Sequence, residues 1–133
     1  MPRLTDYTSY AEAQRHFTGT GLWDLFDGDR ERLNIAHECI DRWAARDSDR
    51  VAVRLANADG SLRELRFGEI AAASSRFAHW LVDRGIALGD RVAIMLEPCP
   101  AFYAALFGAM KAGAVAVPLF TLFGPDALRL RLD

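Results

Sequence analysis

The spacing of apolar residues in the second half of the chain predicts a strand, a helix and another strand in succession. Residues 91–96 form a largely apolar strand, and over residues 101–112 the apolar positions recur at the period of one helical face. Gly113 can adopt the left-handed conformation that closes such a helix. Residues 114–119 are again apolar, which suits a strand covered on both faces of a parallel sheet. Pro118 must lie near the end of that strand, since proline cannot donate to the ladder.

A crossover of this kind is right-handed in nearly all proteins and makes its two strands parallel. Ligands of open parallel sheets bind beyond the carboxyl ends of the strands, so residues 97–100 and 120–124 are the places where a ligand is expected. The second segment leads into Pro125 and Asp126, which favour a helix N-terminus and could place an anion there. A plain loop before a capped helix is the alternative.

Two helices and a β-hairpin are predicted upstream. The helical period extends over residues 34–46 and 68–84, and residues 51–67 predict two antiparallel strands joined by a turn. We expect the hairpin to cover the edge of the larger sheet. The first helix is expected to bury a stripe made of Ile35, Ala36, Cys39, Ile40 and Trp43.

The first 33 residues carry the weakest pattern. Ser9 and Glu12 have the spacing of a capping box, which predicts a short helix to about residue 17, and the glycines that follow are expected to break it. We interpret residues 1–33 as an extension that packs on the body of the protein. Residues 34–133 then form part of an α/β domain.

Composition excludes several classes of function. The 133 residues are 51% hydrophobic and 26% charged, with a formal net charge of −2, so no basic surface indicates a nucleic-acid partner. The longest apolar run is too short to cross a membrane, and the N-terminus lacks the pattern of a signal peptide. We therefore expect a cytoplasmic protein.

Three motifs occur in order along the chain: Leu65-Arg-Phe-Gly-Glu-Ile70, Gly89-Asp-Arg-Val-Ala93 and Met110-Lys-Ala-Gly-Ala-Val-Ala-Val-Pro-Leu119. Together they resemble the AMP-forming acyl-CoA synthetases and related adenylate-forming enzymes, with Phe67 in place of a tyrosine and Ile70 in place of a leucine. The resemblance runs from about Leu33 to the end of the chain. It implies the N-terminal part of the adenylate-forming fold, an incomplete doubly wound sheet with one βαβ unit and a β-hairpin.

The resemblance also implies a chemistry. Such enzymes use ATP and Mg²⁺ to convert a small carboxylic acid to an acyl-adenylate, and then use CoA to form a thioester, a reaction of fatty-acid metabolism. Their phosphate loop, magnesium-binding acid and catalytic lysine have no counterpart in this sequence, so we expect the segment alone to be inactive. No catalytic or metal-binding residue is assigned within it.

One cofactor-binding residue is expected, Phe120. It leaves the carboxyl end of the second predicted strand and matches the first Phe of the F-G-G-F segment that contacts the CoA nucleotide in acetyl-CoA synthetases. Here the segment is Phe120-Thr-Leu-Phe123, so both glycines are replaced. A core phenylalanine that seals the strand end is the alternative.

Two other functions stay open: the adenylation domain of another adenylate-forming ligase, and a noncatalytic α/β module that binds a nucleotide or a partner. An unfinished sheet exposes a strand edge and apolar surface, so the isolated segment is also expected to self-associate.

Overall fold

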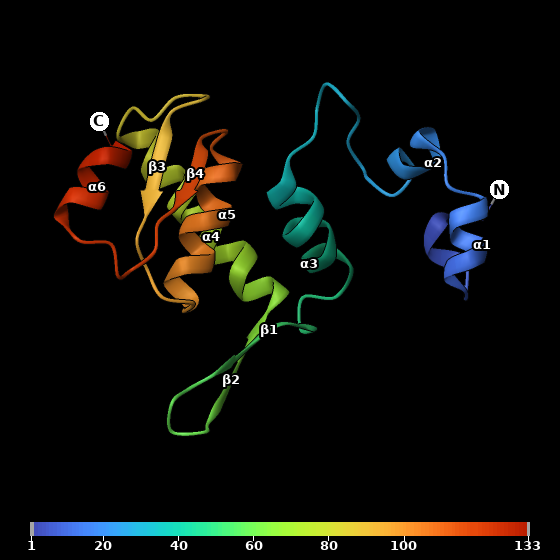
Figure 1. Cartoon of the computed structure of the whole chain (residues 1–133), viewed down its shortest axis with the longest axis horizontal. Helices are drawn as coiled ribbons and strands as arrows, with labels where there is room; N and C mark the ends of the chain where they lie inside the picture. The colour runs from blue at the N-terminus through green and yellow to red at the C-terminus, as the bar shows by residue number, and fades with distance from the viewer. Residues whose placement is uncertain (1, 133) are drawn as a thin grey trace. The chain divides into compact units, whose positions relative to one another are not determined.

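The computed structural model describes residues 2–132 (Figure 1). The chain forms two compact units, which divide between Asn34 and Ile35. The first unit contains a 3₁₀ turn at Leu4–Asp6 and two short helices, α1 (Tyr10–Arg15) and α2 (Gly19–Trp23).

Side-chain caps explain where both short helices begin. The backbone N–H of Glu12 donates to the Ser9 hydroxyl at 3.2 Å, as the sequence predicts for the start of α1. α1 ends at Arg15, so the expected break before the glycines is present. The second helix was not expected: the N–H of Gly21 donates to the Thr18 hydroxyl at 2.9 Å, and this threonine cap starts α2 despite the low helix propensity of the glycines.

The second unit follows the predicted order of elements. Its members are a π-helical turn (His37–Asp41), α3 (Arg42–Arg46), β1 (Val51–Ala56), β2 (Leu62–Arg66), α4 (Phe67–Asp83), β3 (Arg91–Ile94), α5 (Pro100–Lys111), β4 (Val115–Pro118) and α6 (Pro125–Leu132). β3 and β4 pair in parallel, with Val92 opposite Ala116. The βαβ unit is therefore confirmed, with both strands shorter than the apolar runs predict.

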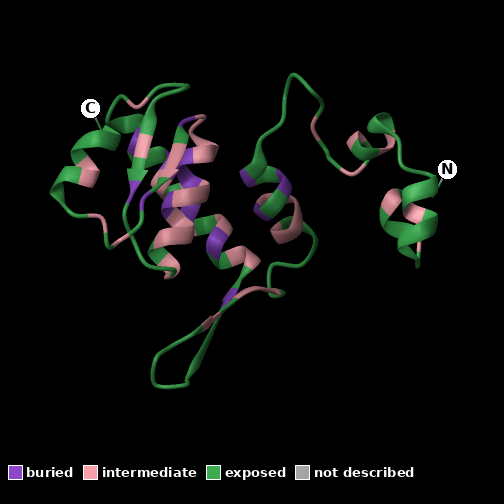
Figure 2. Ribbon diagram, viewed as in Figure 1, coloured by how far each residue is buried: buried purple, intermediate pink, exposed green. Residues whose placement is uncertain are grey.

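The α4–α5 pair forms the centre of this unit, and Figure 2 shows buried residues concentrated on these two helices and on the helix before β1. Gly108 of α5 permits the close approach, because a Cβ atom there would lie 2.7 Å from the Ser74 carbonyl oxygen of α4. Just after the end of α5, Gly113 has φ +75°, the left-handed conformation that the sequence predicts. The chain thus reverses directly from α5 into β4.

The predicted hydrophobic stripe of the first helix is partly wrong. Ala36 and Ile40 are buried, whereas Cys39 is exposed and Ile35 is 53% exposed. Glu38 is buried instead, 7% exposed. The π-helical turn accounts for the changed pattern at Glu38 and Cys39, which lie within it, because it widens the helix locally and departs from a 3.6-residue period. Ile35 precedes the turn.

The β1–β2 hairpin does not cover the edge of the larger sheet. It forms a separate two-stranded antiparallel sheet, and Figure 1 shows it extending away from β3 and β4. Its apolar side instead packs on a small cluster formed by Ile40, Leu65 and Ile70. At its tip, hydrogen bonds from the Ser61 hydroxyl and N–H hold the pKa of Asp59 below its ordinary value.

Candidate functional site

The expected ligand-binding segments meet at the carboxyl end of the βαβ sheet. Beyond β3 lies Glu97, and beyond β4 lies Thr121, whose hydroxyl donates a hydrogen bond to the Glu97 carboxylate. The N–H of Leu119 also donates to the Ile94 carbonyl at 2.8 Å. The two loops are therefore fastened to each other directly beside Phe120, the residue expected to bind the CoA nucleotide.

The Phe120 side chain is 59% exposed within the described chain. Its ring meets the Phe123 ring edge-on, with centroids 5.9 Å apart and planes at 75°. The N–H of Phe123 donates to the Phe120 carbonyl at 3.0 Å, which closes a tight turn between them. This arrangement leaves much of one aromatic ring accessible to a flat ligand while the turn restricts its movement.

Arg131 adds a positive charge to this cluster. Its guanidinium carbon lies 4.1 Å from the centroid of the Phe123 ring, and its Nη1 donates to the Ala127 carbonyl at 2.9 Å. Sequence reasoning missed this residue. Phe123 precedes α6, which starts at Pro125, so the helical spacing of Ala127 and Arg131 did not indicate the contact with Phe123.

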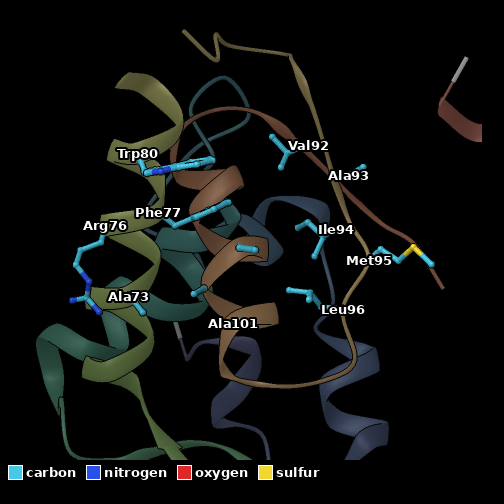
Figure 3. Close-up of a pocket in the computed structure, with 12 residues that line it drawn as sticks. Ala73, Arg76, Phe77, Trp80, Val92, Ala93, Ile94, Met95, Leu96 and Ala101 are labelled. Carbon is cyan, nitrogen blue, oxygen red and sulfur yellow. The ribbon is translucent and has the colours of Figure 1, made fainter. Parts of the chain in front are cut away.

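A second feature, which the sequence did not predict, is an apolar groove of about 600 Å³ between β3, α4 and α5 (Figure 3). We call it the β3 groove. In Figure 3, Phe77 and Trp80 of α4 lie across from Val92 and Ile94 of β3. Arg76 supplies the only charged side chain in its lining.

The β3 groove extends to the edge of β3 that faces away from β4. Side chains of a strand alternate between its two faces, so a groove on one face alone would be lined by every second residue. All of residues 92–96 line this groove. The carbonyls of Asp90 and Ile94 accept hydrogen bonds from the N–H groups of Val115, at the start of β4, and Leu119, just after its end. The residues of β3 at the odd positions therefore direct their backbone groups to the other side. In the described chain that side carries no paired strand.

Lys111, the last residue of α5, has a structural role. Its Nζ donates to the Asp41 carboxylate at 2.6 Å, to the Ala71 carbonyl at 3.1 Å and to the Ser75 hydroxyl at 3.0 Å. The side chain is 12% exposed. Lys111 therefore joins α5 to α4 and to the π-helical turn, and every proton of its ammonium group has an acceptor.

Within residues 2–132, no cluster of three or more His, Cys, Asp or Glu side chains is suited to hold a metal ion. In the same range, none of the helices is both long enough and apolar enough to cross a bilayer.

Comparison with known proteins establishes the family. A model of the family described as AMP-binding enzyme matches residues 40–133. The chain belongs to the AMP-binding enzyme family. The resemblance carried by the three sequence motifs is thereby confirmed.

Individual family members are similar over most of this chain. The acetyl-coenzyme A synthetase of Magnetococcus marinus is 34% identical over 102 residues, which cover 76% of this chain and 16% of that protein. The acetyl-coenzyme A synthetase of Novosphingobium aromaticivorans is 33% identical over 131 residues, which cover 97% of this chain and 20% of that protein. This chain therefore spans a fifth or less of the length of these curated relatives.

The crystal structure of an acyl-CoA synthetase from Brucella canis matches the fold with a TM-score of 0.84 and 35% identity. The match covers 95% of this chain and 23% of that one. The predicted fold class, the N-terminal part of an α/β adenylate-forming fold, is confirmed.

Proposed function

We propose that the chain is the N-terminal segment of an ATP-dependent, AMP-forming acid–CoA ligase. The observation that carries the proposal is the family match over residues 40–133, together with relatives that are acetyl-coenzyme A synthetases. The whole enzyme converts a small carboxylic acid to an acyl-adenylate and then to a CoA thioester, in the cytoplasm and in fatty-acid metabolism. Residues 1–33 act as an extension, and residues 34–133 as one part of the AMP-binding domain.

The segment alone is inactive under this proposal. Mg²⁺ and ATP supply the activated phosphate, and the phosphate loop, magnesium-binding acid and catalytic lysine of similar enzymes have no counterpart in this sequence, so we assign no ligand for either. The test is acid-dependent exchange between ATP and pyrophosphate. We expect exchange by the full-length enzyme and none by the purified 133-residue chain. Exchange by the chain above background would contradict the assignment.

Phe120 binds the CoA nucleotide in this proposal. Its ring is accessible, it follows the carboxyl end of a parallel strand, and the turn to Phe123 restrains it. Stacking between an aromatic side chain and a base contributes about 1–3 kcal/mol. Stacking of the CoA adenine on Phe120 would therefore raise the affinity for CoA by a measurable amount.

Substitution of Phe120 in the full-length enzyme tests this role. Phe120→Ala should raise the KM for CoA in thioester formation roughly tenfold, by the loss of stacking, and leave adenylate formation nearly unchanged. Leu122→Ala is the matched control, because Leu122 is an exposed apolar residue of the same turn, 80% exposed. Equal losses in both half-reactions, with a lower melting temperature, would show that Phe120 is a core residue.

Self-association of the isolated chain is the last part of the proposal. The β3 groove and the free edge of β3 support it, since an unpaired edge beside apolar surface is a site for pairing with another strand. Ala93→Pro removes an outward N–H of β3 and should lower the mass measured by light scattering. A monodisperse, highly stable monomer of the unaltered chain would instead favour a self-contained, noncatalytic module.

A further inference from the structure

Phe120 and Arg131 both contact the Phe123 ring. Phe120 meets it edge-on, and the guanidinium carbon of Arg131 lies 4.1 Å from its centroid. The Glu97 carboxylate, which is bound to Thr121, is a negative charge in the same loop region. The accessible ring and the cation of Arg131 are therefore joined through a single aromatic side chain. An adenine nucleotide has the same order of groups, a flat base and a phosphate on either side of a ribose.

The Arg131 guanidinium is held in place but keeps most of its donors. A guanidinium has five N–H groups, and one of them is used by the Ala127 carbonyl at 2.9 Å. Among the described residues, no carboxylate forms an ion pair with Arg131. Contact with the Phe123 ring restrains the group, which reduces the entropy lost when it binds an anion.

The loop that carries these rings is tied at its start and continues directly into a helix at its end. The hydrogen bond from Thr121 to Glu97 links its start to the loop after β3, and the N–H of Leu128 donates to the Gly124 carbonyl at 3.0 Å in the first turn of α6. Phe120, Phe123 and Arg131 are therefore held together by contacts within the chain itself. Preorganisation of this kind favours binding because few side chains lose conformational freedom when the ligand binds.

We propose that Arg131 binds a phosphate group of the nucleotide whose adenine stacks on Phe120, and so determines the preference for phosphorylated adenosine ligands. The inference rests on the proposed CoA-binding role of Phe120. The phosphate on the ribose and the pyrophosphate of CoA share the chemistry that a guanidinium recognises, and both lie next to the ribose.

The experiment measures binding by calorimetry in the full-length enzyme, with the ATP site saturated by AMP. CoA and dephospho-CoA, which lacks the phosphate on the ribose, are the two probes. Arg131→Leu should weaken CoA binding about tenfold, the usual effect of losing a charge-assisted hydrogen bond. It should also flatten the dependence of CoA affinity on salt concentration, which a purely structural role would leave unchanged. Arg131→Lys should recover part of the affinity.

The two probes identify the phosphate. If Arg131→Leu lowers the affinity for CoA but not for dephospho-CoA, Arg131 binds the phosphate on the ribose. If it lowers the affinity for both probes equally, with the flatter salt dependence, Arg131 binds the pyrophosphate. Arg129→Leu is the matched control, since Arg129 is an exposed arginine of the same helix. Equal effects of Arg131→Leu and Arg129→Leu, or an unchanged salt dependence, would overturn the proposal.

The same experiment separates this inference from the proposed function. If Phe120→Ala weakens CoA binding and Arg131→Leu does not, only the role of Arg131 fails. If Phe120→Ala leaves CoA binding unchanged, the proposed nucleotide site itself fails.

Discussion

The two ends of β4 differ in what their residues do. At the end where α5 leads into the strand, Lys111 is nearly buried and donates to three acceptors on neighbouring helical segments. At the other end, Phe120 is 59% exposed and packs against Phe123 alone among the rings of the described chain. A single short strand therefore connects a region built for stability with one that is open to a ligand. Substitutions at the two ends should separate stability from binding.

The largest loss of stability is expected for Lys111→Met. Methionine has a similar length but removes the three hydrogen bonds that Lys111 donates to the Asp41 carboxylate, the Ala71 carbonyl and the Ser75 hydroxyl. Asp41 is 34% exposed, so the ion pair is only partly buried, and the loss of these charge-assisted hydrogen bonds is expected to cost about 2 kcal/mol. Urea unfolding of the 133-residue chain, followed by circular dichroism at low protein concentration, measures the change in unfolding free energy. A change below about 1 kcal/mol, the usual value for a surface ion pair, would show that the Lys111 contacts do not hold the helices together.

A similar or smaller loss is expected for Gly108→Ala. The new methyl group would lie 2.7 Å from the Ser74 carbonyl oxygen and 2.9 Å from Cδ1 of Phe77, so α4 and α5 must move apart. Overpacking of this kind costs about 1–3 kcal/mol. Gly124→Ala is the control, because a Cβ atom there meets nothing within 4 Å. If both variants unfold at the same urea concentration, the close approach of α4 and α5 at Gly108 does not contribute to stability.

The smallest effect on stability is expected for Phe120→Ala. Its ring is largely exposed, and an edge-on aromatic pair contributes about 1 kcal/mol. The unfolding free energy should therefore change by about 1 kcal/mol or less. A loss as large as that of Lys111→Met would remove the distinction between the two ends of β4.

Much of this architecture follows from local patterns in the sequence. The apolar period predicts α4 and α5, the apolar runs predict β3 and β4, and Gly113 marks the reversal between α5 and β4. These features depend on backbone conformation and on the burial of neighbouring residues, which short stretches of sequence encode.

The contacts that the sequence did not predict depend on distant residues. Lys111 bonds to Asp41 across 70 positions of sequence, and no local rule links them. The π-helical turn likewise changes which side of the helix is buried, through hydrogen bonding that periodicity does not encode. At the candidate site, Phe120 was found by family resemblance. Arg131 became evident only when α6 placed it over Phe123.

The parallel pairing of β3 with β4 also has a consequence for synthesis on the ribosome. β3 emerges first, and its partner follows only after the whole of α5 has been made. At ordinary elongation rates of 5–20 residues per second, the nascent β3 waits about one to five seconds without a neighbour on either side. The β1–β2 hairpin has no such delay, since its second strand follows immediately after the turn. β3 is thus open to chaperones or to neighbouring nascent chains while residues 95–118 emerge from the ribosome.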